Sequence, residues 1–242
     1  MTLLRHTSSL SGGLKFDKKN VHSGRAMLRR LDDRSVKLVF FDPQYREVLD
    51  KMSYGNEGAR MVERSRLPQM DWSLTLDFLQ EIERVLVPSG HLMWWVDKFS
   101  LCENFDNRNR LGSPETPTVD LISWEKWRIG MGYRSRRKCE YLVIKQHPPK
   151  RAKGKWTDHS IPDVWTKAME LEELDRRSYF KVRTREETHP HSKPVGLQSR
   201  LIEAVTRKGD VVVDPCAGGY SVLNACEITG RHFLGCDIRR WT

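Results

Sequence analysis

The sequence contains no apolar run that approaches the roughly 20 residues needed to span a bilayer. Its first nineteen residues are polar and lack the apolar stretch of a signal peptide. Hydrophobic residues make up 38% of the 242-residue chain, which is low for a globular protein. These absences predict a soluble protein with no membrane partner.

The five cysteines of the chain are irregularly spaced. They form no C-x-x-C pair, so neither a disulfide scaffold nor a zinc site is supported. We therefore expect no metal and a reducing, cytoplasmic location. The phosphate-binding patterns G-x-G-x-x-G and G-x-x-x-x-G-K-[ST] are also missing, which argues against dinucleotide binding and nucleotide hydrolysis.

The chain does contain several segments that are typical of buried strands. Residues 36–41, 91–96 and 211–213 are apolar runs, the pattern of parallel strands that are covered on both faces. Residues 72–87 have helical periodicity, and Pro88-Ser89-Gly90 would end that helix. The length suits one α/β domain, and we expect a mostly parallel seven-stranded sheet with helices on both faces.

The chain divides into four segments by composition. Residues 1–19 are rich in Ser and Gly and resemble a flexible arm, and residues 20–147 hold the first strands. Residues 148–188 form a polar insertion that is shorter than an independently folding domain. Residues 189–242 then form a closing βαβ unit.

Positive charge is concentrated in one part of the chain. Residues 126–155 contain eleven Lys and Arg against a single acid, Glu140, which accounts for the whole net charge of +10. Such a block can be an ordinary solvated surface, but interleaved aromatic residues favour a face that binds nucleic acid. The residues predicted to make these contacts are Arg128, Arg134, Arg136, Arg137, Lys138, Lys150, Arg151, Lys153 and Lys155.

A glycine pair follows the strand at 211–213. Gly218 and Gly219 lie between that strand and a helix, where missing side chains let a ligand approach backbone N–H groups. Asp214 would repel a phosphate and attract an ammonium group, and Asp237, at the end of the next strand, suits ribose hydroxyls. S-adenosylmethionine has both an amino-acid end and a ribose, so it satisfies both carboxylates. An ordinary strand-to-helix turn is the alternative.

The strand at 36–41 ends in Asp42-Pro43-Gln44-Tyr45. The exocyclic amine of a nucleobase is a poor nucleophile because its lone pair is delocalised into the ring. If Asp42 accepts one N–H and the Pro43 carbonyl accepts the other, two fixed acceptors stabilise the positive charge that arrives with a methyl group. Tyr45 would stack on the base, which must be flipped out of a duplex. The alternative is a simple turn, since Asp and Pro both favour turns.

Together these segments resemble the DNA amino-methyltransferases, in particular the permuted (beta) group whose catalytic motif precedes its cofactor motif, including small phage or prophage adenine-N6 enzymes. Asp42-Pro43-Gln44-Tyr45 is similar to the family's Asp-Pro-Pro-Tyr. Residues 214–221 are similar to its Asp-Pro-Phe-x-Gly-Ser-Gly-Thr, and residues 189–194 to its His-x-x-x-Lys-Pro. The similarity covers about residues 20–238 and implies a Rossmann-like, S-adenosylmethionine-dependent methyltransferase fold.

By this resemblance the chain methylates the exocyclic amine of a flipped base in DNA. An Asp in the first place of the tetrad favours adenine N6 over cytosine N4. The catalytic residues that the resemblance implies are Asp42, Pro43 and Tyr45. The cofactor-binding residues that it implies are Asp214, Pro215, Gly218, Gly219, Asp237, Lys193, Pro194 and His189.

Three features depart from the family pattern. Gln44 replaces the second proline, and Tyr220 stands where the family has glycine, so we expect reduced activity. Only residues 148–188 are left for target recognition. We therefore expect a short or degenerate target sequence, or a partner, such as a second copy or a specificity subunit, that supplies recognition.

Other functions stay open on the sequence alone. One is a non-catalytic nucleic-acid-binding subunit that kept the fold, and another is methylation of cytosine N4 or of an RNA base. A third is methylation of a glutamine amide in a protein, which the basic block argues against because a peptide substrate needs no concentrated positive face.

Overall fold

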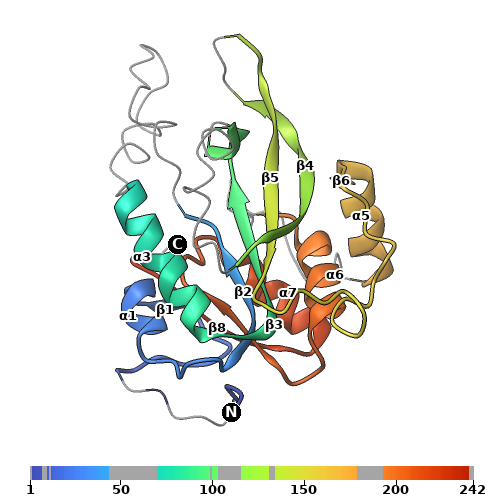
Figure 1. The fold of residues 1–242 in the computed structure, drawn as a ribbon. Coiled ribbons are helices and arrows are strands. Elements are labelled where there is room, and N and C mark those ends of the chain that lie inside the picture. The colour runs from blue at the N-terminus through green and yellow to red at the C-terminus, as the bar shows by residue number, and fades with distance from the viewer. Residues whose placement is uncertain are drawn as a thin grey trace.

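The structure is a computed structural model of the chain (Figure 1). It describes residues 2–6, 10, 12–43, 70–98, 100–102, 116–130, 134–178 and 193–239, except for the side chains at positions 127, 128 and 130. Within these ranges the chain forms an eight-stranded, mostly parallel sheet with helices on both faces. The predicted α/β architecture is confirmed, with one strand more than expected.

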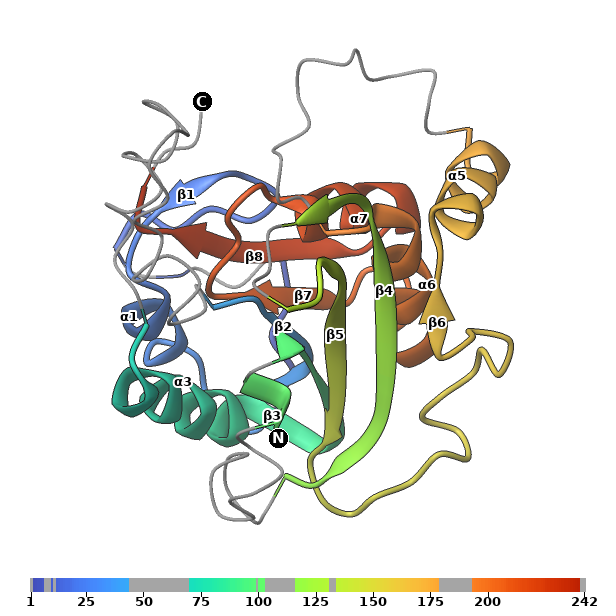
Figure 2. The same cartoon turned by 90° about the horizontal axis from the view of Figure 1, so that it is seen from above.

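The strand order is β1-β8-β7-β2-β3-β5-β4-β6, and all neighbours run parallel except in the two pairings that involve β5. The bounds are β1 Asn20–Val21, β2 Val36–Phe41, β3 Leu86–Val96, β4 Thr118–Gly130, β5 Arg137–Gln146, β6 Val164–Trp165, β7 Val211–Asp214 and β8 His232–Asp237. The other strands therefore end at the edge of the sheet where β5 begins (Figures 1 and 2).

The helices α1 and α3 cover one face of the sheet, and α6 and α7 cover the other (Figure 2). Their bounds, with that of α5, are α1 Gly24–Leu28, α3 Trp72–Val85, α5 Lys167–Arg176, α6 Val195–Val205 and α7 Ser221–Thr229. None of these described helices is both long enough and apolar enough to cross a membrane.

Strand β2 is apolar throughout its buried part because both of its faces are covered. Val39 and Phe41 pack into the core that includes α3, while Leu38 and Phe40 pack into the core that includes α6 and α7. Each of these four side chains is at most 1% exposed. Burial on this scale contributes roughly 1.5–3 kcal/mol per side chain, so β2 anchors the centre of the sheet.

The register of β2 brings the two predicted sites together. Leu38 pairs with Val212 and Val39 pairs with Val213, with the strands parallel. Asp42 follows the end of β2 and Asp214 is the last residue of β7, so both carboxylates lie at the same edge of the sheet. The prediction that these two strands are adjacent and parallel is confirmed.

Strand β3 begins earlier than the sequence predicted. Helix α3 ends at Val85 and the chain enters the strand directly at Leu86, without the break expected at Pro88-Ser89-Gly90. Ser89 instead takes a left-handed conformation with φ 62°, and its N–H donates to the His147 carbonyl at 3.0 Å. Pro88-Ser89-Gly90 therefore forms an irregularity within β3 and does not separate the helix from the strand.

The amino-terminal segment, for which the sequence predicted a flexible arm, lies against the core in its described part. Leu14 is buried, and Leu4, Leu10 and Phe16 pack against the same cluster. These four apolar residues are spread among polar ones without helical or strand periodicity, so the sequence gives no sign that they share a face.

The predicted insertion at 148–188 is joined to the rest of the domain through β6 and α5. Strand β6 pairs with β4, and Glu170 of α5 accepts from the N–H groups of Gly196 and Leu197 at 2.8 and 3.2 Å. Glu170 therefore caps the start of α6, which directly follows Lys193 and Pro194. The segment boundaries at 19, 147 and 188 stay predictions.

One buried histidine should make stability depend on pH. His91 of β3 contacts Gln146 Nε2 at 3.2 Å, and burial, helped by the charge of Lys155, lowers its pKa from 6.5 to about 4. Because its folded pKa lies below its unfolded pKa, His91 contributes stability above pH 6.5 that is lost as the pH falls towards 4. The contribution is about 3 kcal/mol at 1.36 kcal/mol per unit.

We expect His91→Gln to remove most of this pH dependence. Urea unfolding at pH 7 and pH 4.5 should show a much larger loss of unfolding free energy in the parent chain than in the variant. His159→Gln, at an exposed position, is the matched control and should behave like the parent. Equal losses in the parent and in His91→Gln would contradict this assignment.

Candidate active site

Three carboxylates meet at the edge of the sheet where β2, β7 and β8 end. Asp42 follows β2, Asp214 ends β7 and Asp237 ends β8. Asp214 is 3% exposed, and its carboxylate Oδ1 accepts from the Cys216 N–H at 3.0 Å. Parallel strands that end in acids therefore place three acidic side chains at one edge, at the centre of the sheet.

Lys193 is the cation at the centre of this edge. Its Nζ lies 3.0 Å from Asp42 Oδ1 and 2.8 Å from Glu140 Oε2, and 5.4 Å from the centre of the Trp95 ring. The Lys193 side chain is only 7% exposed. A buried ammonium group thus joins the carboxylate of the predicted catalytic motif to a carboxylate on β5.

The charges in this cluster stabilise one another. Burial alone would lower the pKa of Lys193, but the charges of Asp42 and Glu140 outweigh it and raise that pKa. Burial would likewise raise the pKa of Glu140, yet Lys193 and Lys126 lower it to about 2. The ammonium group of Lys193 and the carboxylate of Glu140 are therefore both charged at neutral pH.

Asp214 lies in an environment that disfavours its negative charge. Burial raises its pKa well above the usual range of a carboxyl group. The nearby charges of Asp42 and Asp237 raise it further, and the Cys216 N–H and the Lys193 ammonium oppose this only in part. A positively charged ligand bound here would relieve that repulsion, so the site favours a cation.

The loop after β7 has the shape needed to hold a ligand against backbone. Gly218 has φ +44°, and a Cβ at this position would meet no atom within 4 Å. Its N–H donates to Asp237 Oδ2 at 3.1 Å, which ties the loop to the end of β8. Helix α7 starts just beyond, and its N-cap residue makes no side-chain capping bond. The loop therefore presents open space, carboxylates and a helix N-terminus together.

Tyr220 does not fill this loop. Its backbone takes the left-handed conformation with φ 58°, which costs roughly 1 kcal/mol for a residue other than glycine. Its ring is buried edge-on to Phe233, and its hydroxyl donates to the Asn20 carbonyl at 2.7 Å. The side chain is thus directed into the core, which removes one of the two reasons for expecting reduced activity.

The other residues predicted from the cofactor motifs lie near the same edge where they are described. Pro215 is buried, and a Cβ on Gly24 would lie 2.0 Å from its carbonyl oxygen, so α1 packs directly on the loop. Pro43 is buried after Asp42, and Pro194 is the N-cap residue of α6. Tyr45, Gln44 and His189 lie outside the described residues.

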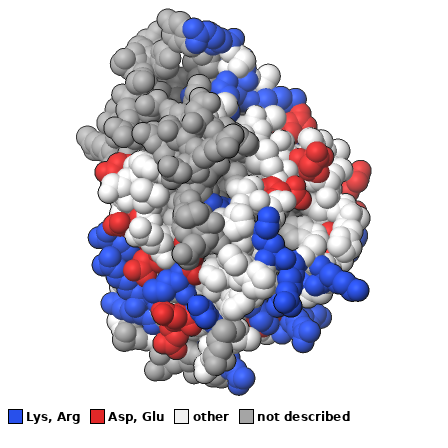
Figure 3. Space-filling model, viewed as in Figure 1, with Lys and Arg blue, Asp and Glu red and all other residues white. Residues whose placement is uncertain are grey.

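The residues that the sequence predicted to contact nucleic acid lie near the two ends of β5. Exposed or half-exposed residues at its start, on the edge that carries Asp42, are Arg134, Arg136, Arg137 and Lys138. Residues that follow its other end are Lys150, Arg151, Lys153 and Lys155. Along β5, Lys138 and Gln146 are eight residues apart, which is roughly 27 Å at 3.4 Å per strand residue. Figure 3 shows basic side chains towards both ends of the molecule. The side chain of Arg128 lies outside the described part.

Glu140 is a site residue that the sequence did not assign. It stands out in the sequence as the single acid among eleven basic residues. Its partnership with Lys193, 53 residues away, appears only once β5 is placed antiparallel beside β3. An isolated acid in a basic strand is the signal that points to such a buried partner.

Comparison with known proteins agrees with this arrangement. The sequence matches the N6_N4_Mtase family of DNA methylases over residues 36–240. It is 47% identical over 223 residues to the type II methyltransferase M.HhaII of Haemophilus parahaemolyticus, a match that covers 92% of this chain and 91% of the relative.

Solved structures share the fold. TTHA0409 of Thermus thermophilus, in complex with S-adenosyl-L-methionine, is 20% identical with a TM-score of 0.53, and the match covers 90% of this chain and 86% of that one. The cytosine-N4-specific PvuII DNA methyltransferase is 14% identical with a TM-score of 0.59, over 92% of this chain and 82% of that one. The chain therefore belongs to the N6_N4_Mtase family of DNA methylases.

Proposed function

We propose that the protein transfers the methyl group of S-adenosylmethionine to N6 of an adenine flipped out of DNA. The observation that carries this proposal is the pairing of parallel strands β2 and β7, which puts Asp42 and Asp214 at one edge. A donor held at the end of β7 and an amine held at the end of β2 are then neighbours, since adjacent strands lie about 5 Å apart.

The donor side is formed by the loop after β7 and the end of β8. Asp214, Gly218 and Gly219 would hold the methionine end, beside Pro215, and Asp237 would hold the ribose hydroxyls. The cofactor brings a sulfonium and an ammonium charge to a place where carboxylates repel one another, so its binding is favoured electrostatically. When bound, it supplies an electrophilic methyl group.

The acceptor side is formed by the residues after β2. Asp42 would accept one N–H of the target amine and the Pro43 carbonyl the other, and Tyr45 would stack on the base. A carboxylate has about four lone-pair sites, so Asp42 can accept from the amine while it is paired with Lys193. The acceptors stabilise the positive charge that develops on nitrogen, and they hold the amine in line with the methyl group.

Lys193 and Glu140 act as positioning residues in this proposal. The resemblance places Lys193 beside the cofactor, and in the structure its ammonium group contacts Asp42 and Glu140. It fixes the Asp42 carboxylate, while Glu140 balances the buried positive charge. Lys193 would thus have two roles: it lies beside the cofactor, as the resemblance implied, and it positions Asp42.

The start of β5 is the proposed site of contact with the DNA backbone. Arg134, Arg136, Arg137 and Lys138 lie at the edge that carries Asp42, and contacts with the base and with phosphates would offset the few kcal/mol needed to flip the base. Lys150, Arg151, Lys153 and Lys155 follow the far end of β5 and serve as a natural internal control.

Salt dependence of DNA binding tests this surface. If the four basic side chains at the start of β5 meet phosphates, the affinity should fall with a log-log slope of roughly −3.6, at 0.9 per contact. Arg134→Gln with Arg136→Gln should make the slope less steep by about 2, at 0.9 per contact. Lys150→Gln with Lys153→Gln should leave it unchanged. Equal effects of the two double variants would show that the whole basic block meets DNA, against the division proposed.

The methyl acceptor is tested with cofactor that carries a labelled methyl group. Unmethylated DNA should take up the label. RNA of the same sequence should not take it up, and neither should a denatured protein that is offered as the methyl acceptor. Label in RNA alone would replace the DNA substrate by an RNA base. Cofactor binding without transfer to any acceptor would favour a non-catalytic subunit.

The finer assignments are also proposals. Asp42 precedes Asp214 in the chain, which supports the permuted group, and the described part of 148–188 is the candidate for reading a short target sequence. A second copy or a specificity subunit is the alternative source of recognition. A cytoplasmic location and a phage or prophage origin would suit a small DNA methyltransferase.

A further inference from the structure

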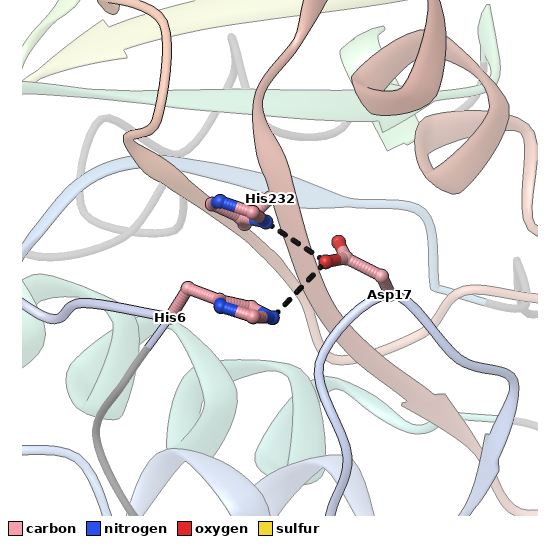
Figure 4. Close-up of side chains that lie close together, drawn as sticks. All are labelled: His6, Asp17 and His232. Carbon is pink, nitrogen blue, oxygen red and sulfur yellow. Dashed lines mark hydrogen bonds and ion pairs between the residues drawn. The ribbon is translucent and has the colours of Figure 1, made fainter.

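A second cluster of chemically active side chains lies at the opposite end of β8 from Asp237. Figure 4 shows the imidazole rings of His6 and His232 with one ring nitrogen each directed at the carboxylate of Asp17. Asp17 Oδ2 lies 2.8 Å from His232 Nδ1 and 3.4 Å from His6 Nε2. Among the described residues, these three form a group whose ligand atoms all lie within 4.8 Å of one another.

These separations suit a small divalent cation. Zinc binds imidazole nitrogen at about 2.0–2.1 Å and carboxylate oxygen at about 2.0–2.2 Å. Tetrahedral ligands at those lengths are roughly 3.3 Å apart, and the two oxygen–nitrogen distances, 2.8 and 3.4 Å, lie on either side of that value. The rings are stacked, with centroids 4.0 Å apart and planes 18° from parallel, so one ring must rotate before both nitrogens point at a single ion.

The fold holds two of the three residues in place. His232 is the first residue of β8. Asp17 is locked to the same strand because its N–H donates to the Phe233 carbonyl at 2.8 Å and its Oδ1 accepts from the Phe233 N–H at 2.7 Å. Asp17 also has φ 54°, a conformation that non-glycine residues rarely take. The backbone thus bends at Asp17 and directs Oδ2 at the two histidines.

His6 brings the third ligand from the amino-terminal segment. Its ring packs edge-on to Phe16 with centroids 5.3 Å apart, and its side chain is about half exposed. The Leu4 N–H, nearby in the chain, donates to the Ser35 carbonyl at 2.9 Å. A metal at this place would join the start of the chain, the turn before β1 and the amino end of β8.

We propose that His6, Asp17 and His232 form a site for a divalent cation of the zinc class. Two imidazoles and one carboxylate are donors that zinc accepts readily, and the exposure of His6 leaves access for water as a further ligand. The site lies at the amino end of β8, about 17 Å from Asp237 at 3.3 Å per residue. The bound ion therefore fastens the amino-terminal segment to the sheet and takes no part in chemistry at the other end.

Calorimetric titration of the untagged, chelator-treated full chain with Zn²⁺ tests the site. We expect one equivalent to bind, and the melting temperature to rise with Zn²⁺ because the ion binds the folded state. His6→Ala and Asp17→Asn should each weaken Zn²⁺ binding at least tenfold and abolish the rise. His159→Ala, at an exposed histidine elsewhere, should keep both.

The design separates loss of a ligand from loss of the fold. His6 is exposed and Asp17→Asn keeps the oxygen that accepts from the Phe233 N–H, so both variants should melt like the parent without zinc. Affinity for S-adenosylmethionine should be the same in all of them. If the parent binds no stoichiometric Zn²⁺, or if His6→Ala and Asp17→Asn bind it as the parent does, the cluster is a hydrogen-bonded clamp and the proposal is overturned.

Discussion

Asp42→Asn should lower kcat for DNA methylation by about 10³-fold, a loss typical of removing a group that stabilises transition-state charge. The substitution keeps the shape of the side chain but removes the negative charge that would face the developing positive charge on the amine. Asp42 lies at the end of β2, whereas the cofactor residues lie at the ends of β7 and β8. The dissociation constant for S-adenosylmethionine should therefore stay within a few-fold of the parent value.

Asp214→Asn supplies the matched control for that experiment. Asp214 is the buried carboxylate of the proposed donor site, so its loss should weaken cofactor binding first, and saturating cofactor should restore part of the turnover. Calorimetry with the cofactor and steady-state kinetics with DNA measure the two effects separately. Equal loss of cofactor affinity in both variants would contradict the division into donor and acceptor sides.

Lys193→Met should be the second substitution with a large effect. Removing the ammonium group leaves Glu140 partly unpaired at a site where its side chain is 13% exposed, and breaking a buried pair costs about 3 kcal/mol. It also removes the cation that fixes Asp42. We therefore expect lower stability in urea unfolding, together with a fall in kcat of about 10²-fold.

A double variant separates these two effects. Lys193→Met with Glu140→Gln leaves no unpaired buried carboxylate on β5, so it should recover most of the lost unfolding free energy. It should not recover turnover, because Asp42 still lacks its cation. Recovery of kcat together with stability would mean that Lys193 serves the fold alone. Unchanged kcat in the single variant would remove Lys193 from the acceptor side altogether.

The central edge of the site was predictable because it depends on local patterns. An apolar strand followed by an acid occurs at Asp42 and again at Asp214, and parallel strands that are buried on both faces gather at the centre of a sheet. Their ends must then share one edge. The place of Gly218 between β7 and α7 followed from the same strand–glycine–helix pattern.

Features that depend on tertiary placement were not predictable. The sequence showed one continuous basic block, but β5 runs antiparallel to its neighbours and carries the two halves of the block to different ends of the sheet. Strand β4 was missed because its charged residues hide the alternation expected of a strand. The contact between His232 and Asp17 joins residues 215 positions apart, and no local pattern marks such a pair.

Identification of the methylated nucleoside tests the central claim most directly. DNA treated with the protein and S-adenosylmethionine is digested to nucleosides and analysed by mass spectrometry against synthetic standards. Two acceptors that grip an exocyclic amine predict a methylated amino group, which under the proposed adenine preference is N6-methyl-2′-deoxyadenosine, and this product should be absent from DNA treated with the Asp42→Asn variant. Methylation at a ring carbon, or no methylated nucleoside at all, would contradict the account.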